Sequence, residues 1–132
     1  MLKKTITYTD YNGVQRTQDF YFNLNKAEIM EMQLSTAGGL GEMLTKLIAA
    51  QDMPSLIKIF KDLILKSYGE KGPDGVHFVK SEALSTAFSQ TEAFSELFTE
   101  LATNAEAASA FVNGIVPAEI SKQANQTKAL PN

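Results

Sequence analysis

The sequence is poor in the residues on which enzyme chemistry most often depends. It contains no cysteine, and His77 is its only histidine. Without cysteine, disulfide bonds and thiolate metal sites are excluded, and a histidine metal site or proton relay usually needs further ligands or titratable groups nearby. Because His77 lies between two apolar residues directly after a glycine-rich loop, we interpret it as a loop or strand histidine without a catalytic role.

The glycines and serines form no recognisable catalytic or nucleotide-binding motif. No G-x-S-x-G nucleophile motif is present. Residues 36–44, TAGGLGEML, contain G-G-x-G but lack the G-x-x-x-x-G-K-[ST] spacing of a phosphate-binding loop, so a flexible break between helices is favoured. Residues 69–75, GEKGPDG, lack the oxygen-ligand spacing of a calcium loop. We therefore expect a protein that is not an enzyme and that has no catalytic residue, metal or cofactor.

Long hydrophobic runs and an excess of positive charge are also missing. Apolar runs such as LIAA at 47–50 fall far short of the roughly 20 residues that span a bilayer, and the N-terminus does not resemble a secretory signal. The 12 basic and 15 acidic residues give a net charge of −3, which argues against a nucleic-acid binder and a polybasic membrane anchor. We expect an intracellular protein with no nucleic-acid or membrane partner.

The N-terminal region has the alternating pattern of β-strands. In residues 2–8, Leu2, Ile6 and Tyr8 share one face, and residues 17–24 alternate in the same way. Between these runs, Asn12-Gly13 supplies residues suited to the positive φ angles of a tight turn. This pattern predicts an antiparallel hairpin, which must pack on helices or on another chain because an isolated hairpin is only marginally stable.

From Asn25 onward the apolar residues repeat with the period of helices. Asn25 with Glu28, and Ser89 with Glu92, have the spacing of capping boxes. The remaining helix signals are starts at Pro54, Ser81 and Asn104 and stops at Gly69 and Gly114. Residues 76–80, VHFVK, fit either a third strand or a surface crossing.

These signals predict an α+β fold, mainly α, in which an N-terminal β-hairpin packs on a bundle of five to six helices. A chain of 132 residues with 44% apolar residues suits one domain. We expect residues 1–117 to form it, with the hairpin at 1–24 and helices at 25–117, followed by a polar, flexible tail at 118–132. The predicted core residues are Leu24, Ile29, Leu44, Leu47, Phe60, Ile64, Leu84, Phe88, Phe94, Leu97, Phe98, Leu101 and Phe111.

Residues 91–103 combine an apolar stripe with an acidic one. Glu92, Glu96 and Glu100 are neighbours on a helix surface, and repulsion between such like charges costs only a few tenths of a kcal/mol per pair. We interpret this acidic row mostly as the solvated side of a packed helix. The alternative is a docking face, in which the row orients a partner and an apolar groove supplies the affinity. The candidate partner-binding residues are Glu92, Glu96, Glu100, Met30, Met43, Phe94 and Phe98.

Three segments of the sequence contain the phrases FYFNL at 20–24, LILKSYGEK at 63–71 and FVNGIVP at 111–117. With these segments, the chain resembles the tail assembly chaperones of long-tailed, siphovirus-type bacteriophages and prophages of Gram-positive bacteria. The resemblance covers roughly residues 1 to 117 and depends on overall pattern, because none of the phrases is a diagnostic motif.

The resemblance implies a non-enzymatic protein made late in infection. It would bind the long, largely helical tape measure protein in the host bacterial cytoplasm and keep it soluble while tail tube subunits polymerise around it. It would be absent from the mature virion. The tail tube protein is a second possible partner, and we expect a homo-oligomer because a chaperone of this kind has to coat a long client.

Two other functions compete with this interpretation. A minor virion component of the tail, neck or head–tail junction would persist in purified particles, and its hairpin could add to a sheet of neighbouring subunits. A small enzyme or nucleotide-binding protein is disfavoured by the absence of catalytic and phosphate-binding motifs.

Overall fold

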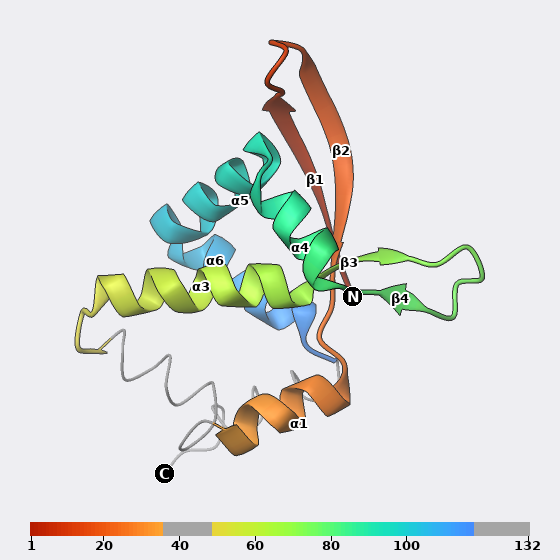
Figure 1. Cartoon of the computed structure of the whole chain (residues 1–132). Coiled ribbons are helices and arrows are strands. Elements are labelled where there is room, and N and C mark those ends of the chain that lie inside the picture. The colour runs from red at the N-terminus through yellow and green to blue at the C-terminus, as the bar shows by residue number, and fades with distance from the viewer. Residues whose placement is uncertain (36–48, 118–132) are drawn as a thin grey trace.

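The computed structural model describes residues 1–35 and 49–117, and its elements are those of an α+β protein that is mainly α, as predicted. The described elements are β1 (Leu2–Thr9), β2 (Gln15–Phe22), α1 (Lys26–Ser35), α3 (Met53–Ser67), β3 (Tyr68–Lys71), β4 (Phe78–Val79), α4 (Glu82–Ser89), α5 (Glu92–Thr103) and α6 (Ala105–Ile115). The long β1–β2 hairpin extends beyond the helices, and the shorter β3–β4 hairpin projects in a different direction (Figure 1).

The N-terminal hairpin is present with the predicted sidedness. β1 and β2 are antiparallel, and their register runs from Leu2 opposite Phe22 to Thr9 opposite Gln15. The face that carries Ile6 and Phe22 packs on the helices, whereas the threonines of the opposite face are exposed. Burial of this one apolar face explains why the period-two pattern was a reliable signal.

The turn of this hairpin differs from the tight turn that we predicted. Residues 10–14 connect the strands, and Gly13 has a φ of 81° whereas Asn12 has no positive φ. The Asp10 carboxylate accepts hydrogen bonds from the backbone N–H groups of Asn12 (2.9 Å) and Val14 (3.0 Å). A longer loop of this kind needs only one left-handed residue, because the turn is stabilised by the aspartate.

A second hairpin interrupts the region that the sequence pattern assigned to helices. The sheet has the order β1-β2-β3-β4, and β2 pairs with β3 only through Tyr21 with Gly69 and Phe22 with Tyr68. The helix that we expected to continue to Gly69 ends at Ser67, and the strand alternative for residues 76–80 is confirmed at Phe78–Val79.

Gly69 is required by close packing rather than by a helix stop. A Cβ atom on Gly69 would lie 2.7 Å from the Phe78 ring and 2.7 Å from the Val79 carbonyl oxygen. Only a residue without a side chain therefore fits between the two short strands.

Helix capping follows the sequence at most positions. The Asn25–Glu28 capping box forms as predicted, with the Glu28 N–H 2.8 Å from Oδ1 of Asn25 and the Asn25 N–H 3.0 Å from Oε1 of Glu28. Ser81 and Asn104 also cap their helices as predicted. The prediction for Ser89 is wrong, because this residue lies inside α4 and Thr91 caps α5 instead.

The end of α6 also differs from the prediction. The helix continues through Gly114 to Ile115, so Gly114 does not terminate it. A Cβ atom on Gly114 would approach a methyl carbon of Leu2 to 2.9 Å, so this glycine allows α6 to lie close against β1.

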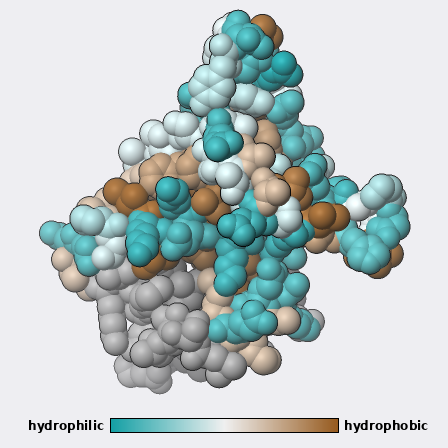
Figure 2. Space-filling view, viewed as in Figure 1, coloured by the Kyte–Doolittle hydropathy of each residue, from teal (hydrophilic) through white to brown (hydrophobic). Residues whose placement is uncertain are grey.

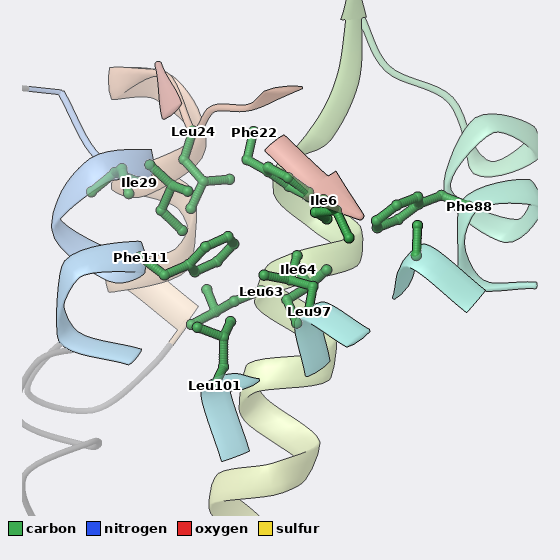
Figure 3. Close-up of a cluster of buried hydrophobic side chains, with 12 residues drawn as sticks. Ile6, Phe22, Leu24, Ile29, Leu63, Ile64, Phe88, Leu97, Leu101 and Phe111 are labelled. Carbon is green, nitrogen blue, oxygen red and sulfur yellow. The ribbon is translucent and has the colours of Figure 1, made fainter. Parts of the chain in front are cut away.

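The core lies where the apolar face of the long hairpin meets α3, α5 and α6 (Figure 3). The predicted core residues that are buried there are Leu24, Ile29, Ile64, Phe88, Leu97, Leu101 and Phe111. Three further predicted residues pack against the cluster while remaining partly exposed: Phe60, Phe94 and Phe98. Leu84 is partly buried outside the cluster, and Leu44 and Leu47 fall outside the described residues. The prediction omitted Ile6, Phe22, Leu63, Ala93 and Ile115, which are buried.

Lys80 fastens the base of the short hairpin to the start of α1. Its Nζ lies 2.8 Å from both carboxylate oxygens of Glu28 and donates a hydrogen bond to the Asn23 carbonyl oxygen. Both charged side chains are about three-quarters buried, with exposures of 21% and 23%. Glu28 therefore serves both the helix cap and an ion pair between segments distant in sequence.

Candidate partner-binding surfaces

The acidic row on α5 faces the long hairpin as well as solvent. Leu97 and Leu101 are buried in the core, which turns the glutamate side of α5 toward β1. The Glu100 carboxylate pairs with Lys4 on β1 at 2.9 Å. At the other end of the row, partial loss of solvent around the Tyr11 hydroxyl and the adjacent Glu92 carboxylate raise the pKa of Tyr11.

The three glutamates therefore have different roles. Glu92 is half-buried near the hairpin turn, and Glu100 forms an ion pair. Glu96 is exposed, and within residues 1–35 and 49–117 no side chain forms an ion pair with it. The row is largely exposed, and its two ends also meet Lys4 and Tyr11, which come from a part of the chain that the helical pattern does not include.

A groove runs between the outer edge of β1 and α5. Its volume is about 320 Å³. The lining residues are Lys4, Thr5, Ile6, Thr7, Glu96, Leu97, Thr99, Glu100 and Thr103. The groove is mainly polar and acidic on its α5 side, so it suits an extended or basic segment better than a hydrophobic ligand.

The apolar candidates do not form one surface. The rings of Phe94 and Phe98 lie together with centroids 5.8 Å apart, and Phe94 also packs edge-on against Phe88 at 5.8 Å. Met30 has 63% of its surface exposed but belongs to α1, on the opposite side of α3 from α5 (Figure 1). Met43 falls outside the described residues.

An exposed face of α3 was not singled out as a binding surface by the sequence. Met53 and Ile57 are 49% and 38% exposed, and Lys58 and Lys61 lie beside them on the same exposed side of the helix. Hydrophobic side chains gather over α3 and toward α5 in Figure 2. The signal available in the sequence was the spacing of Met53, Ile57 and Lys61 by four residues, which places them along one line of the helix. We name Met53, Ile57, Lys58 and Lys61 the α3 face.

His77 lies in the loop of the short hairpin. It is exposed at the tip of the β3–β4 hairpin, where its Nδ1 lies 2.6 Å from Oδ2 of Asp74. Backbone N–H groups of Val76 and His77, followed by the His77 ring, lower the pKa of Asp74. Across the described residues, no group of three or more histidine, aspartate or glutamate side chains could hold a metal ion.

These surfaces are suited to binding. The described residues contain no buried side-chain nitrogen or oxygen without a hydrogen-bond partner, and none of their helices is long and apolar enough to cross a membrane. The features available to a partner are the α3 face, the groove beside β1 and the outer surfaces of Phe94 and Phe98.

Comparison with known proteins agrees with the resemblance carried by the three sequence segments. No curated protein and no solved structure is detectably similar to the chain. The model of one protein family, described as phage tail assembly chaperone, matches residues 1–132, which is the whole sequence. The chain therefore belongs to the phage tail assembly chaperone family.

Proposed function

We propose that this protein binds the tape measure protein of a siphovirus-type phage or prophage and keeps it soluble during assembly of the tail tube. The protein acts late in infection, in the host cytoplasm, without catalysing a reaction, and leaves before the virion is complete. Family membership supports the general role. The observation that carries the specific proposal is the α3 face, where partly exposed apolar side chains lie beside the exposed lysines Lys58 and Lys61.

The α3 face fits the chemistry of such a client. A tape measure protein is long and largely helical, so before assembly it exposes apolar stripes that must be covered. Met53 is unbranched and adapts to irregular apolar surfaces, while Ile57 adds further apolar contact area. Lys58 and Lys61 would favour a client helix whose flanking residues are acidic, and charge complementarity would set its orientation.

The direct test is co-expression with the tape measure protein of the same phage or prophage, measured by client solubility and co-purification. The double variant Met53→Asp/Ile57→Asp removes apolar contact area, and we expect client binding at least about tenfold weaker, since burying one such side chain contributes about 1.5–3 kcal/mol. Val76→Asp is the matched control, because Val76 is 79% exposed at the tip of the short hairpin and lies outside the α3 face.

The role of the acidic row is tested in the same system. Glu96→Lys reverses the charge of the row member without an ion pair, whereas Glu100→Lys would also break the contact with Lys4. Weaker client binding by Glu96→Lys, relieved at high salt, would assign the row a part in orientation. If the wild type and every variant keep the tape measure protein equally soluble, neither the α3 face nor the acidic row takes part in client binding.

The alternative is a minor virion component of the tail, neck or head–tail junction. Mass spectrometry of purified particles separates the two functions, because a chaperone is absent and a structural component is present in fixed copy number. Failure to rescue the tape measure protein together with presence in particles would replace the chaperone proposal by this one. A further possible partner is the tail tube protein, and co-purification in the absence of the tape measure protein would detect it.

A further inference from the structure

Within the part of the chain that the structure describes, the outer edge of β1 pairs with no other strand. The Asp10 N–H donates to the Val14 carbonyl oxygen at 2.9 Å, which fixes the alternation of the antiparallel ladder. Even-numbered residues of β1 thus direct their backbone N–H and C=O groups toward β2, and odd-numbered residues direct theirs outward. The outward residues are Lys3, Thr5, Thr7 and Thr9, and all four are exposed.

This edge is long for a strand left without a neighbour. β1 has 8 residues and stands at the end of the sheet order, so no described strand covers it. Natural proteins usually shorten, bulge or cover such edges, because they readily pair with another chain. The edge also borders the groove between β1 and α5, so side chains of an added strand that face the helix side would lie beside this groove.

We propose that a second copy of this chain pairs its β1 antiparallel with this edge, so that the two sheets become continuous. A register that pairs residues 3–9 of the two strands keeps outward-directed residues opposite one another and places Ile6 opposite Ile6 of the other copy. Thr5 then lies opposite Thr7, Lys4 opposite Tyr8 and Lys3 opposite Thr9. No like charges face each other directly, and the outward backbone groups of Thr5 and Thr7 pair with one another.

Charge on α5 favours the same arrangement. Lys4 faces the helix side of the sheet, and in this register Lys4 of the second copy lies at the level of Tyr8. Along the hairpin, Tyr8 lies between Lys4 and Tyr11. Glu100 contacts Lys4, and Glu92 approaches Tyr11. Glu96 lies between these two glutamates on α5 and is the row member without an ion pair in the described residues, so it adds a second carboxylate near the incoming Lys4, which also contacts Glu100 of its own copy.

This interface is separate from the α3 face, so the proposal does not depend on the identity of the client. A single strand edge buries less area than a typical stable interface, so we expect a dissociation constant in the micromolar range. The measurement should therefore cover protein concentrations from about 1 to 500 µM. Sedimentation equilibrium of the full chain should show a reversible monomer–dimer transition. A monomer throughout this range would overturn the proposal.

Two proline variants distinguish the edge from the rest of the hairpin. Thr7 and Thr17 form a hydroxyl–hydroxyl hydrogen bond of 2.9 Å, and both direct their backbone N–H groups away from the hairpin ladder. Thr7→Pro and Thr17→Pro therefore lose the same side-chain bond, but only Thr7→Pro blocks the β1 edge. We expect Thr7→Pro to weaken dimerisation at least about tenfold and Thr17→Pro to leave it unchanged.

A measurement on the unmodified chain covers the case in which either proline disturbs folding. Amide hydrogen exchange at low and high protein concentration should show new protection at Thr5 and Thr7 on dimerisation, while Thr17 and Asp19 exchange equally in both. Glu96→Gln should weaken the dimer severalfold, with Glu106→Gln on α6 as the matched control. Protection confined to other residues, or a dimer that persists in folded Thr7→Pro, would overturn the assignment of this edge. Protection of Thr5 and Thr7 only when another protein is added would overturn self-pairing in favour of an extended partner segment.

Discussion

The two hairpins of the sheet are held in place by different interactions. The β1–β2 hairpin packs the apolar part of one face on α5 and α6, with Ile6 and Phe22 in the core. The β3–β4 hairpin is fixed at its base by close packing around Gly69 and by the ion pair of Lys80 with Glu28, while its tip is exposed. Substitutions in the first should therefore affect global stability, and substitutions in the second should act locally.

The largest expected effect comes from Phe22→Ala in the long hairpin. Phe22 is fully buried, and its ring contacts those of Tyr68, Phe88 and Phe111 at 5.4–5.7 Å. Removing it leaves a cavity, and we expect a loss of about 3–5 kcal/mol in the free energy of unfolding, measured by urea denaturation.

Tyr21→Ala is the control for this substitution. Tyr21 neighbours Phe22 on the opposite face and is half-buried, with Lys71 Nζ 4.6 Å from its ring centroid. We expect a cost near 1 kcal/mol, because a contact of this kind at an accessible site contributes about 0.5–1 kcal/mol. Equal losses in the free energy of unfolding for Phe22→Ala and Tyr21→Ala would contradict a hairpin that packs only one of its faces on the helices.

Gly69→Ala should have a smaller and more local effect. The added methyl group would meet the Phe78 ring and the Val79 carbonyl, and displacing them costs about 1–3 kcal/mol. Hydrogen exchange should accelerate at amides of β3 and β4 and remain slow in the centre of β1–β2. Acceleration throughout both hairpins would show that the short one is not an independent local unit.

The smallest effect concerns the aspartates of the two turns. Hydrogen bonds to Arg16 and to backbone N–H groups lower the pKa of Asp10, and backbone N–H groups with the His77 ring lower the pKa of Asp74. A carboxyl whose folded pKa is lowered stabilises the fold above its unfolded pKa, and this contribution disappears as the pH falls through the folded pKa. Both carboxyls should therefore titrate below 3.8 in an NMR pH titration.

Side-chain substitutions distinguish the two turns in the same titration. Arg16 is the largest cause of the shift at Asp10, whereas the His77 ring ranks behind two backbone N–H groups at Asp74. Arg16→Ala should thus raise the pKa of Asp10 more than His77→Ala raises that of Asp74. The reverse order would mean that the His77 side chain, and not the backbone N–H groups, dominates the pKa shift of Asp74 in the β3–β4 hairpin.

Sequence patterns predicted the parts of the fold that local residues determine. Alternation identified the buried face of β1 and β2, and the Asn25, Ser81 and Asn104 caps all begin helices. The strand at Tyr68–Lys71 was missed, because four residues with two charges and a glycine become a strand only by pairing with β2.

The candidate surfaces were predicted less completely than the fold. Helical periodicity placed Glu92, Glu96 and Glu100 on one side of α5, but the partner of Glu100 is Lys4, 96 residues away in the chain. Periodicity reports which side of a helix is apolar and does not identify the element that its polar side meets. The exposure of Met53 and Ile57 depends in the same way on tertiary contacts that the sequence alone does not reveal.

The outer strands of the sheet differ in length, with 8 residues in β1 and 2 in β4. Pairing of like edges about a twofold axis uses each β1 once and closes after two copies, whereas head-to-tail pairing would need a second edge able to receive β1. The two-residue β4 is too short for that purpose, but β2 pairs with β3 only at Tyr21 and Phe22, so its residues 15–20 offer such an edge among the described residues. Pairing of β1 with β1 therefore ends at two copies, whereas pairing of β1 with β2 would continue as a fibre, and protein that stays soluble at high concentration would favour the first arrangement.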